Sequence, residues 1–316
     1  MKAIVVEHVT KHYAKHPNAL QDVSFDVDQG ELFGLIGPDG AGKTSMFRIL
    51  TTVLLADSGT ASVDGFDVKA DYKSIRARVG YMPGRFSLYQ DLSVEENLNF
   101  FAKVFRTSIE KNYDLVRDIY VQLEPFKTRR AGKLSGGMKQ KLALCCALIH
   151  KPSVLFLDEP TTGVDPVSRR EFWEMLRRLK EQNISILVST PYMDEASLCD
   201  RIAFIQNGHI LSIDTPERIT ANFHKTLFAV QADSMFEALL HLREAEFCET
   251  CYAFGDAHHL TLKTTSTTEA EVVRYLEQYG HKNVHVVRIN AGIEDTFMSL
   301  SQSSAENVAK STEVQP

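Results

Sequence analysis

The chain has 316 residues, of which 44 % are hydrophobic and 24 % charged, and its formal net charge is −6 at pH 7. This length allows one large domain, or a large and a small one, and the negative charge argues against nucleic acid or an anionic membrane surface as the main partner. The longest apolar run is Leu142–Ile149, far shorter than the roughly 20 residues that span a bilayer. The charged residues Lys2 and Glu7 come too early for a signal peptide. We therefore expect a cytoplasmic protein that reaches the inner face of the cell membrane only through a partner.

The first strong signal is a strand, a glycine-rich loop and a helix between residues 31 and 50. Glu31–Ile36 predicts a short buried strand, and Ser45–Leu50 predicts the start of a helix. The loop between them fits G-x-x-x-x-G-K-[ST], in which backbone N–H groups at a helix N-terminus form a cradle for phosphate. Lys43 would bind the β- and γ-phosphates, and the Thr44 hydroxyl would bind a Mg²⁺ ion. We predict binding of a nucleoside triphosphate, with a plain glycine-rich turn as the alternative. The candidate contacts are Gly37, Pro38, Asp39, Gly40, Ala41, Gly42, Lys43, Thr44 and Ser45.

A polar, helix-rich stretch extends from about residue 84 to residue 150. Its first helix is predicted at Ser93–Glu96, which fits a capping box and is followed by apolar residues on one face. Further on, Ser135, Gly136 and Gly137 precede another helix, and the glycines would expose backbone N–H groups as a second anion-binding helix start. Two phosphate-binding ends in one chain indicate that they contact two different nucleotides in a dimer.

A second apolar segment, Val154–Leu157, predicts a buried central strand that ends at two carboxylates, Asp158 and Glu159. Phosphoryl-transfer sites use such groups to bind Mg²⁺ and to orient the attacking water. We assign the metal to Asp158 together with Thr44, and the catalytic role to Glu159.

The five cysteines do not indicate a disulfide framework. Cys248 and Cys251 form a single C-x-x-C in a predicted strand, where positions i and i+3 point to opposite faces. No second pair completes a zinc site, so we predict no redox or metal function there.

Together these motifs resemble those of ABC transporter ATP-binding subunits, over residues 1 to about 215. Leu134–Met138 resembles the family's signature motif, and Asp158–Glu159 resembles its Walker B pair. The resemblance implies that Tyr13 stacks on adenine. It also implies that Ser135, Gly136 and Gly137 contact the γ-phosphate of the ATP bound to a partner subunit.

Two further runs, 79–89 and 189–196, resemble the ABC-2 type, drug-resistance exporter ATPases. This likeness implies an ATPase that forms a dimer over ATP with a second ATP-binding subunit, either identical or different. It also implies that the dimer powers a separate ABC-2 type membrane permease, for export.

Two positions depart from the family pattern. Family members place a glutamine where this chain has Gly84 and a histidine where it has Pro191, and Gln90 lies six residues too late to replace the glutamine. Glycine has no side chain, and proline has neither a titratable group nor an N–H donor. The resemblance therefore implies ATP binding with impaired hydrolysis at this chain's own P-loop site. In a heterodimer, the intact signature motif would complete the partner's site.

After Thr215-Pro216 the pattern changes, and predicted strands and helices follow in the order β-α-β-β-α-β, which is typical of a ferredoxin-like fold. The predicted fold class is an α/β P-loop NTPase domain of the ABC type with a helical subdomain, over residues 1–215, plus a small α+β accessory domain over 216–302. Residues 303–316 are rich in polar residues and predicted to be disordered. The alternatives are a non-transport regulatory or ribosome-associated ABC ATPase, and a subunit that binds ATP without hydrolysing it.

Overall fold

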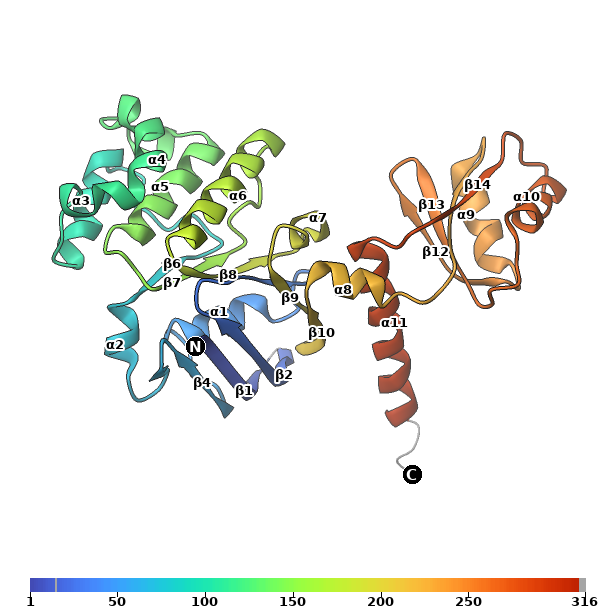
Figure 1. The fold of residues 1–316 in the computed structure, drawn as a ribbon, viewed down its shortest axis with the longest axis horizontal. Helices are drawn as coiled ribbons and strands as arrows, with labels where there is room; N and C mark the ends of the chain where they lie inside the picture. The colour runs from blue at the N-terminus through green and yellow to red at the C-terminus, as the bar shows by residue number, and fades with distance from the viewer. Residues whose placement is uncertain (15, 313–316) are drawn as a thin grey trace. The chain divides into compact units, whose positions relative to one another are not determined.

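The structure is a computed structural model that describes residues 1–14 and 16–312 (Figure 1). The chain separates into two compact units, Met1–Pro216 and Glu217–Pro316. Each unit has its own hydrophobic core. Along the described residues, no helix has both the length and the apolar character that are needed to cross a membrane.

The centre of the first unit is a six-stranded sheet with the strand order β10-β9-β3-β8-β7-β6. All of these strands are parallel except β10, which pairs with β9 as an antiparallel hairpin at the edge. The apolar runs of β3, β7 and β8 are buried along their whole length, as central parallel strands require. The strands are β3 (Leu32–Ile36), β6 (Val79–Met82), β7 (Val154–Asp158), β8 (Ser185–Thr190), β9 (Arg201–Gln206) and β10 (His209–Asp214).

Helices cover both faces of this sheet (Figure 1). Helix α1 packs on one face, against β7, and α6 packs on the other, against β3 and β8. Phe47 of α1 meets Phe156 of β7 edge to face, with 6.1 Å between the ring centroids. The helices outside the helical subdomain are α1 (Lys43–Leu50), α2 (Tyr72–Arg76), α6 (Pro166–Glu181), α7 (Met193–Ala196) and, at the unit boundary, α8 (Pro216–Ala221).

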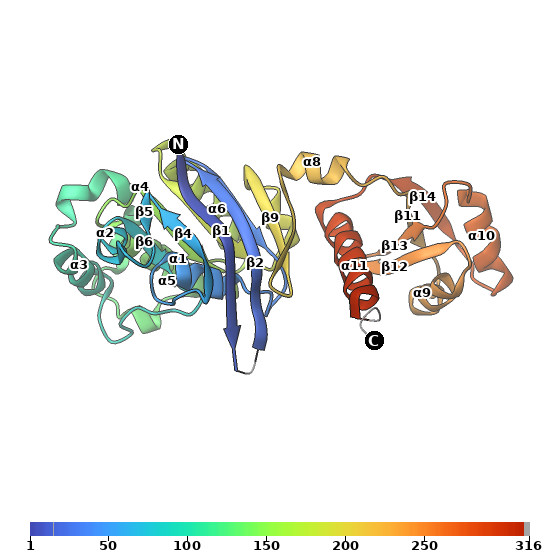
Figure 2. The ribbon, with the colours of Figure 1, turned by 90° about the horizontal axis from the view of Figure 1, so that it is seen from below.

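A second, antiparallel sheet with the order β2-β1-β4-β5 shares the core of this unit (Figure 2). Alternating side chains of its first strand, such as Ile4 and Val6, are buried in that core, as expected for a half-buried strand. The strands are β1 (Lys2–Tyr13), β2 (His16–Asp28), β4 (Ser58–Val63) and β5 (Phe66–Asp67).

The predicted helical subdomain lies between β6 and β7. The capping box that opens it is confirmed, because Ser93 Oγ accepts the Glu96 N–H at 3.2 Å and Glu96 Oε2 accepts the Ser93 N–H at 2.8 Å. Helices α3 and α4 both pack against α5. The helical subdomain consists of α3 (Val94–Val104), α4 (Tyr113–Leu123), α5 (Gly136–Leu148) and three 3₁₀ turns, Glu110–Asn112, Glu124–Phe126 and Ala131–Lys133.

The second unit has the predicted β-α-β-β-α-β order. Its four strands form an antiparallel sheet with the order β12-β13-β11-β14. Helices α9 and α10 pack on the sheet face that carries Phe228, Val230 and Leu260. The elements are β11 (Leu227–Gln231), α9 (Met235–Glu244), β12 (Cys248–Phe254), β13 (Ala257–Leu262), α10 (Glu269–Gln278) and β14 (His285–Ile289).

Cys248 and Cys251 both lie in this core, so the prediction that they point to opposite faces is wrong. A shift in strand register between Cys248 and Thr250 adds one residue to β12, and such a bulge changes the face on which the following side chains lie. Burial raises the pKa of the Cys248 thiol, and it raises the pKa of Cys251 to about 12. All five cysteines are free.

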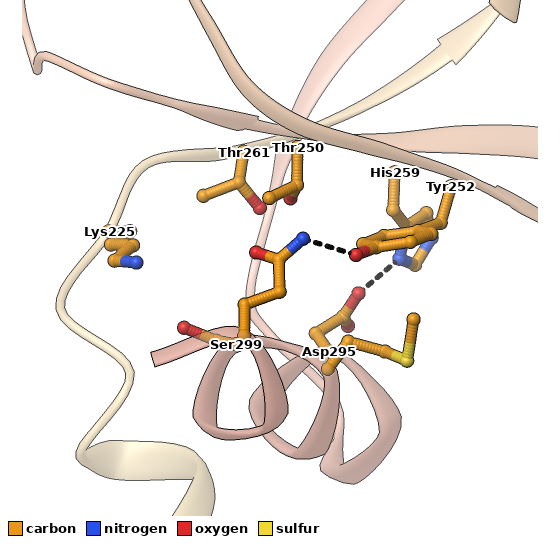
Figure 3. A pocket seen from close by; sticks show the side chains of 9 residues that line it. Lys225, Thr250, Tyr252, His259, Thr261, Asp295 and Ser299 are labelled. Atoms are coloured by element: carbon orange, nitrogen blue, oxygen red, sulfur yellow. Dashed lines mark hydrogen bonds and ion pairs between the residues drawn. The ribbon is translucent and has the colours of Figure 1, made fainter. Parts of the chain in front are cut away.

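The first part of helix α11 (Ile293–Thr312) contacts the other face of this sheet (Figure 3). Asp295 Oδ1 lies 2.7 Å from His259 Nδ1, and Gln302 donates to the Tyr252 hydroxyl, beside a cavity of about 10 Å³. Helix α11 continues to Thr312, into the segment from residue 303 for which we predicted disorder. Residues 293–312 contain no glycine or proline that would end the helix. Residues 313–316 lie outside the described residues.

Candidate active site

Four loops that carry candidate residues leave the central sheet at the same edge. Strands β3, β8, β7 and β6 are neighbours and parallel, with Ser189 directly opposite Asp158. The carboxyl ends of parallel strands meet at one edge of a sheet, so the residues that follow them come together there. This edge gathers the glycine-rich loop after β3, Pro191 after β8, Glu159 after β7 and Gly84 after β6.

The glycine-rich loop runs so close to neighbouring backbone that two of its glycines admit no side chain. A Cβ at Gly37 would lie 2.0 Å from the Ile205 carbonyl oxygen, and a Cβ at Gly42 would lie 2.3 Å from that of Ala19. Gly42 also has a φ of 107° immediately before α1, a backbone conformation that glycine adopts easily. The loop can therefore present its N–H groups at the helix N-terminus, as a phosphate cradle requires.

Lys43, the first residue of α1, turns its side chain back into the loop. Its buried ammonium donates to the carbonyl oxygens of Gly37 at 2.7 Å and Pro38 at 3.0 Å. It also lies 3.2 Å from Glu159 Oε1. The positive charge is thus fixed between the loop and the end of β7, where a phosphate would gain a charge-assisted contact.

One hydroxyl contacts both residues at the end of β7, the carboxylate of Asp158 and the backbone of Glu159. Ser189 Oγ donates to Asp158 Oδ1 at 2.7 Å and accepts the Glu159 N–H at 3.0 Å. Asp158 is only 2 % exposed, and Glu159 has a φ of 50°, so the backbone turns sharply there. Sequence reasoning missed Ser189. A serine at the end of a buried strand is a weak signal, and only the strand register shows what it faces.

The oxygen atoms at this edge suit Mg²⁺, which prefers oxygen ligands. Among the described residues, Asp158 Oδ2 and the Thr44 hydroxyl form no hydrogen bond and so could bind a metal. No group of three or more His, Cys, Asp and Glu side chains in the described part of the chain could bind a metal alone. A Mg²⁺ ion at Asp158 and Thr44 would therefore take its other ligands from the nucleotide phosphates and water.

Tyr13, the last residue of β1, lies beside the start of α1. Its hydroxyl is 3.2 Å from Ser45 Oγ, and the Lys11 ammonium is 5.9 Å from the centre of its ring. The half-buried ring is thus anchored beside the start of α1, and its contact with adenine stays a prediction.

The second predicted anion site forms the exposed start of α5. Ser135 caps this helix, because its hydroxyl accepts the Met138 N–H at 3.4 Å. A Cβ at Gly137 would lie 2.6 Å from Ser168 Oγ, so the glycine permits close packing against α6. Ser135 and Gly136 are exposed, and α5 lies across the sheet from α1 (Figure 1). The two predicted anion-binding helix starts therefore do not share one site within the chain.

Comparison with known proteins assigns this arrangement to a family. A family model described as "ABC transporter" matches residues 20–162. The daunorubicin resistance ATP-binding protein of Streptomyces coeruleorubidus is 32 % identical over 313 residues, which cover 96 % of this chain and 97 % of that protein. The chain belongs to the ABC transporter ATP-binding proteins.

Two further matches agree with this ABC family. The "Probable multidrug ABC transporter ATP-binding protein YbhF" of Escherichia coli is 36 % identical over 286 residues, which cover 89 % of this chain. The match spans about half the length of that protein, 49 %. A solved structure described as the ATP binding subunit of an ABC transporter matches 70 % of this chain and 93 % of its own, with a TM-score of 0.64 and 28 % identity. The P-loop NTPase fold of the ABC type predicted from the sequence is thus confirmed.

In this ABC chain, Gly84 lies against the end of the Walker B strand. A Cβ there would lie 3.0 Å from the Asp158 carbonyl oxygen and 3.8 Å from Glu159 Cβ. A side chain at this position would begin beside the backbone of Asp158 and the side chain of Glu159, and glycine supplies none. Gln90 pairs instead with Gly132 in the helical subdomain, through a backbone hydrogen bond of 2.9 Å.

Pro191 lies in a loop that is fixed by a buried polar network. Thr190 Oγ1 donates to Glu195 Oε2 at 2.6 Å, and Glu195, only 2 % exposed, pairs with Arg169 at 3.0 Å. The Gly37 N–H donates to the Thr190 carbonyl at 3.3 Å, which joins this loop to the P-loop. Position 191 is thus well defined beside the phosphate cradle, but its side chain offers no hydrogen-bonding group.

Proposed function

We propose that this chain is the ATP-binding subunit of an ABC-2 type transporter, which dimerises over Mg·ATP and powers a separate permease for export. The observation that carries the proposal is the meeting of Lys43, Asp158 and Glu159 at one edge of the sheet. The curated relatives named for drug resistance and multidrug transport support export as the direction.

The proposed site divides its work among a few residues. The P-loop N–H groups and Lys43 bind the phosphates, Tyr13 stacks on adenine, and Thr44 with Asp158 provides the oxygen ligands for Mg²⁺. The metal supplies charge neutralisation at the phosphates. Glu159 orients the attacking water and accepts its proton, because its carboxylate lies 3.2 Å from the Lys43 ammonium and its backbone is fixed in the turn after β7.

We infer that hydrolysis at this chain's own P-loop is slow. Gly84 lies against the end of β7, and Pro191 follows Thr190, whose carbonyl accepts the Gly37 N–H. Neither position carries a side-chain group that could contact the γ-phosphate or the water. The exposed signature residues Ser135 and Gly136 remain available to the nucleotide on a partner subunit. In a heterodimer with a complete partner, the productive site would use this chain's signature.

A groove of about 310 Å³ supports the proposed contact with a permease. It lies among the end of α1, β6, α3 and α5, and the apolar side chains of Phe101 and Phe105 line it beside the exposed Val53. Pro83, which directly precedes Gly84, also lines the groove. An apolar helix of the permease that docks there would contact the loop that leads into the active site, and would bring the chain to the inner face of the membrane.

Titration with Mg·ATP tests the nucleotide assignment. We expect micromolar to millimolar affinity for the full chain, and at least about tenfold weaker binding for Lys43→Ala, which loses a charge-assisted phosphate contact. The matched control is Lys69→Ala, at an exposed lysine outside the site, which should bind as the wild type does. Equal affinity of Lys43→Ala and Lys69→Ala would contradict the proposal.

A further inference from the structure

Ser189 links the carboxylate of Asp158 to the backbone of Glu159 in the proposed site. It is the penultimate residue of β8 and is fully buried. In the parallel pairing of β8 with β7 it lies opposite Asp158. Its hydroxyl donates to Asp158 Oδ1 at 2.7 Å and accepts the Glu159 N–H at 3.0 Å. The Ser189 carbonyl oxygen accepts the same N–H at 3.1 Å.

The direction of these bonds follows from the groups themselves. An ionised carboxylate can only accept, so the single hydroxyl proton of Ser189 must point to Asp158 Oδ1. The oxygen lone pairs of the hydroxyl are then free to accept from Glu159. The bond to Oδ1 fixes the plane of the Asp158 carboxylate and leaves Oδ2 for another ligand. The two bonds to the Glu159 N–H stabilise its left-handed backbone, whose φ is 50°.

We propose that Ser189 is a positioning residue for metal binding and catalysis, acting through Asp158 and Glu159 without touching the nucleotide. This inference rests on the proposed function, because it requires that Asp158 binds the metal of a nucleotide complex. Removal of a residue that orients a metal ligand weakens metal binding by about 10- to 100-fold. The geometry gives this role to one hydroxyl in the interior of the sheet.

The same strand provides a matched control. Ser185 begins β8, is 2 % exposed, and accepts the Gly30 N–H at 3.0 Å through its own hydroxyl. This bond joins the Ser185 hydroxyl to the backbone and involves no carboxylate. Ser185→Ala therefore removes a buried serine hydroxyl and one backbone bond from the same strand, without changing a proposed metal ligand.

The test uses the full chain, Mn²⁺ as the probe metal and a non-hydrolysable ATP analogue. Free Mn²⁺ is measured by electron paramagnetic resonance, and thermal unfolding of each variant is measured alongside. We expect Ser189→Ala to weaken Mn²⁺ binding to the nucleotide complex by about tenfold, while binding of the analogue without metal changes little. Ser189→Thr retains the hydroxyl and should bind Mn²⁺ more tightly than Ser189→Ala.

The possible outcomes distinguish the role of Ser189 from the proposed function. Equal Mn²⁺ affinity of Ser189→Ala and Ser185→Ala would overturn the role of Ser189 and leave the proposed function standing. A wild-type chain that binds no analogue would contradict both. If Ser189→Ala weakens binding of the metal-free analogue as much as it weakens Mn²⁺ binding, the serine supports the fold of the site and not the metal, which also overturns the proposal.

Discussion

Lys43 Nζ lies 3.2 Å from Glu159 Oε1, so the phosphate-binding ammonium and the carboxylate at the end of β7 face each other directly. The lysine is almost fully buried and the glutamate is about three-quarters buried, with 3 % and 23 % of their side chains exposed. A γ-phosphate bound at Lys43 would therefore lie near the negative charge of Glu159, and the two anions would repel each other.

Neutralising that carboxylate should strengthen nucleotide binding while it removes the proposed base. We expect Glu159→Gln to bind Mg·ATP about fivefold more tightly than the wild type, since one partly solvated like charge is worth on the order of 1 kcal/mol. Calorimetric titration measures this change. The control Glu181→Gln alters an exposed glutamate at the end of α6 and should leave affinity unchanged. Weaker binding by Glu159→Gln would show that the carboxylate assists nucleotide binding.

Restoring the missing side chains should accelerate hydrolysis. Loss of one positioned transition-state donor typically costs about 10²–10³ in rate, so we expect slow turnover by the purified chain and faster turnover by Gly84→Gln combined with Pro191→His. The recovery should be partial, because a Cβ at position 84 would lie 3.0 Å from the Asp158 carbonyl and the loop would have to shift. Phosphate release measures both rates.

The matched control for this pair is Gly84→Ala combined with Pro191→Ala. It introduces the same backbone changes without a functional group, so it should hydrolyse ATP as slowly as the wild type. Brisk hydrolysis by the unmodified chain would mean that other residues stabilise the transition state.

A charge in the groove should prevent assembly with a permease. Val53 is 64 % exposed and lines the groove, whereas Val121 on α4 is 49 % exposed and does not. We therefore expect Val53→Glu, but not Val121→Glu, to reduce co-purification with a co-expressed ABC-2 type permease, while ATP binding stays intact. If both variants co-purify equally well, the permease docks elsewhere on this chain.

His150 should make the fold sensitive to acid. Burial lowers its pKa below the ordinary value of about 6.5, although the bond between Nε2 and the Val79 carbonyl acts in the opposite direction. The ring stacks on Phe105, and Nδ1 has no hydrogen-bond partner among the described residues. The unfolded chain binds this proton first as the pH falls below about 6.5, so stability is lost from there down to the lowered pKa of the folded state. When the pH is lowered from about 7.5 to about 5.5, the melting temperature of His150→Phe should therefore fall less than that of the wild type.

The control for that measurement is His224→Phe, at an exposed histidine of the second unit. Its melting temperature should fall on acidification by as much as that of the wild type. An equal loss in all three proteins would mean that protonation of His150 does not contribute.

The P-loop NTPase fold could be predicted because its motifs are local. The glycine-rich loop at 37–44 needs only the strand before it and the helix after it, and both are adjacent in the sequence. The capping box at Ser93 and Glu96 is equally local, since its two bonds join residues one helical turn apart. In the second unit, the order of strands and helices was enough to predict the fold class.

Relationships across strands could not be predicted in the same way. The bond from Ser189 to Asp158 joins residues that are 31 positions apart, and it depends on the register of two parallel strands. The common face of Cys248 and Cys251 depends on one bulge in β12, which no residue type marks. The pair formed by His259 and Asp295 requires that α11 packs on the outer face of the sheet, which composition does not reveal.

We propose that a heterodimer has one slow ATP site, on this chain's P-loop, and one productive site, which uses this chain's signature residues. The most direct test is the ATPase rate of a complete transporter, assembled from this chain, a partner ATP-binding chain and the permease. Ser135→Arg fills the exposed start of α5, and Ser135→Asp keeps an acceptor for the helix cap while it repels phosphate. Both should lower the rate by about 100-fold or more, by analogy with the loss of a positioned transition-state donor. Glu159→Gln should leave most of the rate, because it affects a site that is already slow. A complex that Glu159→Gln silences and that tolerates both Ser135 variants would contradict the account.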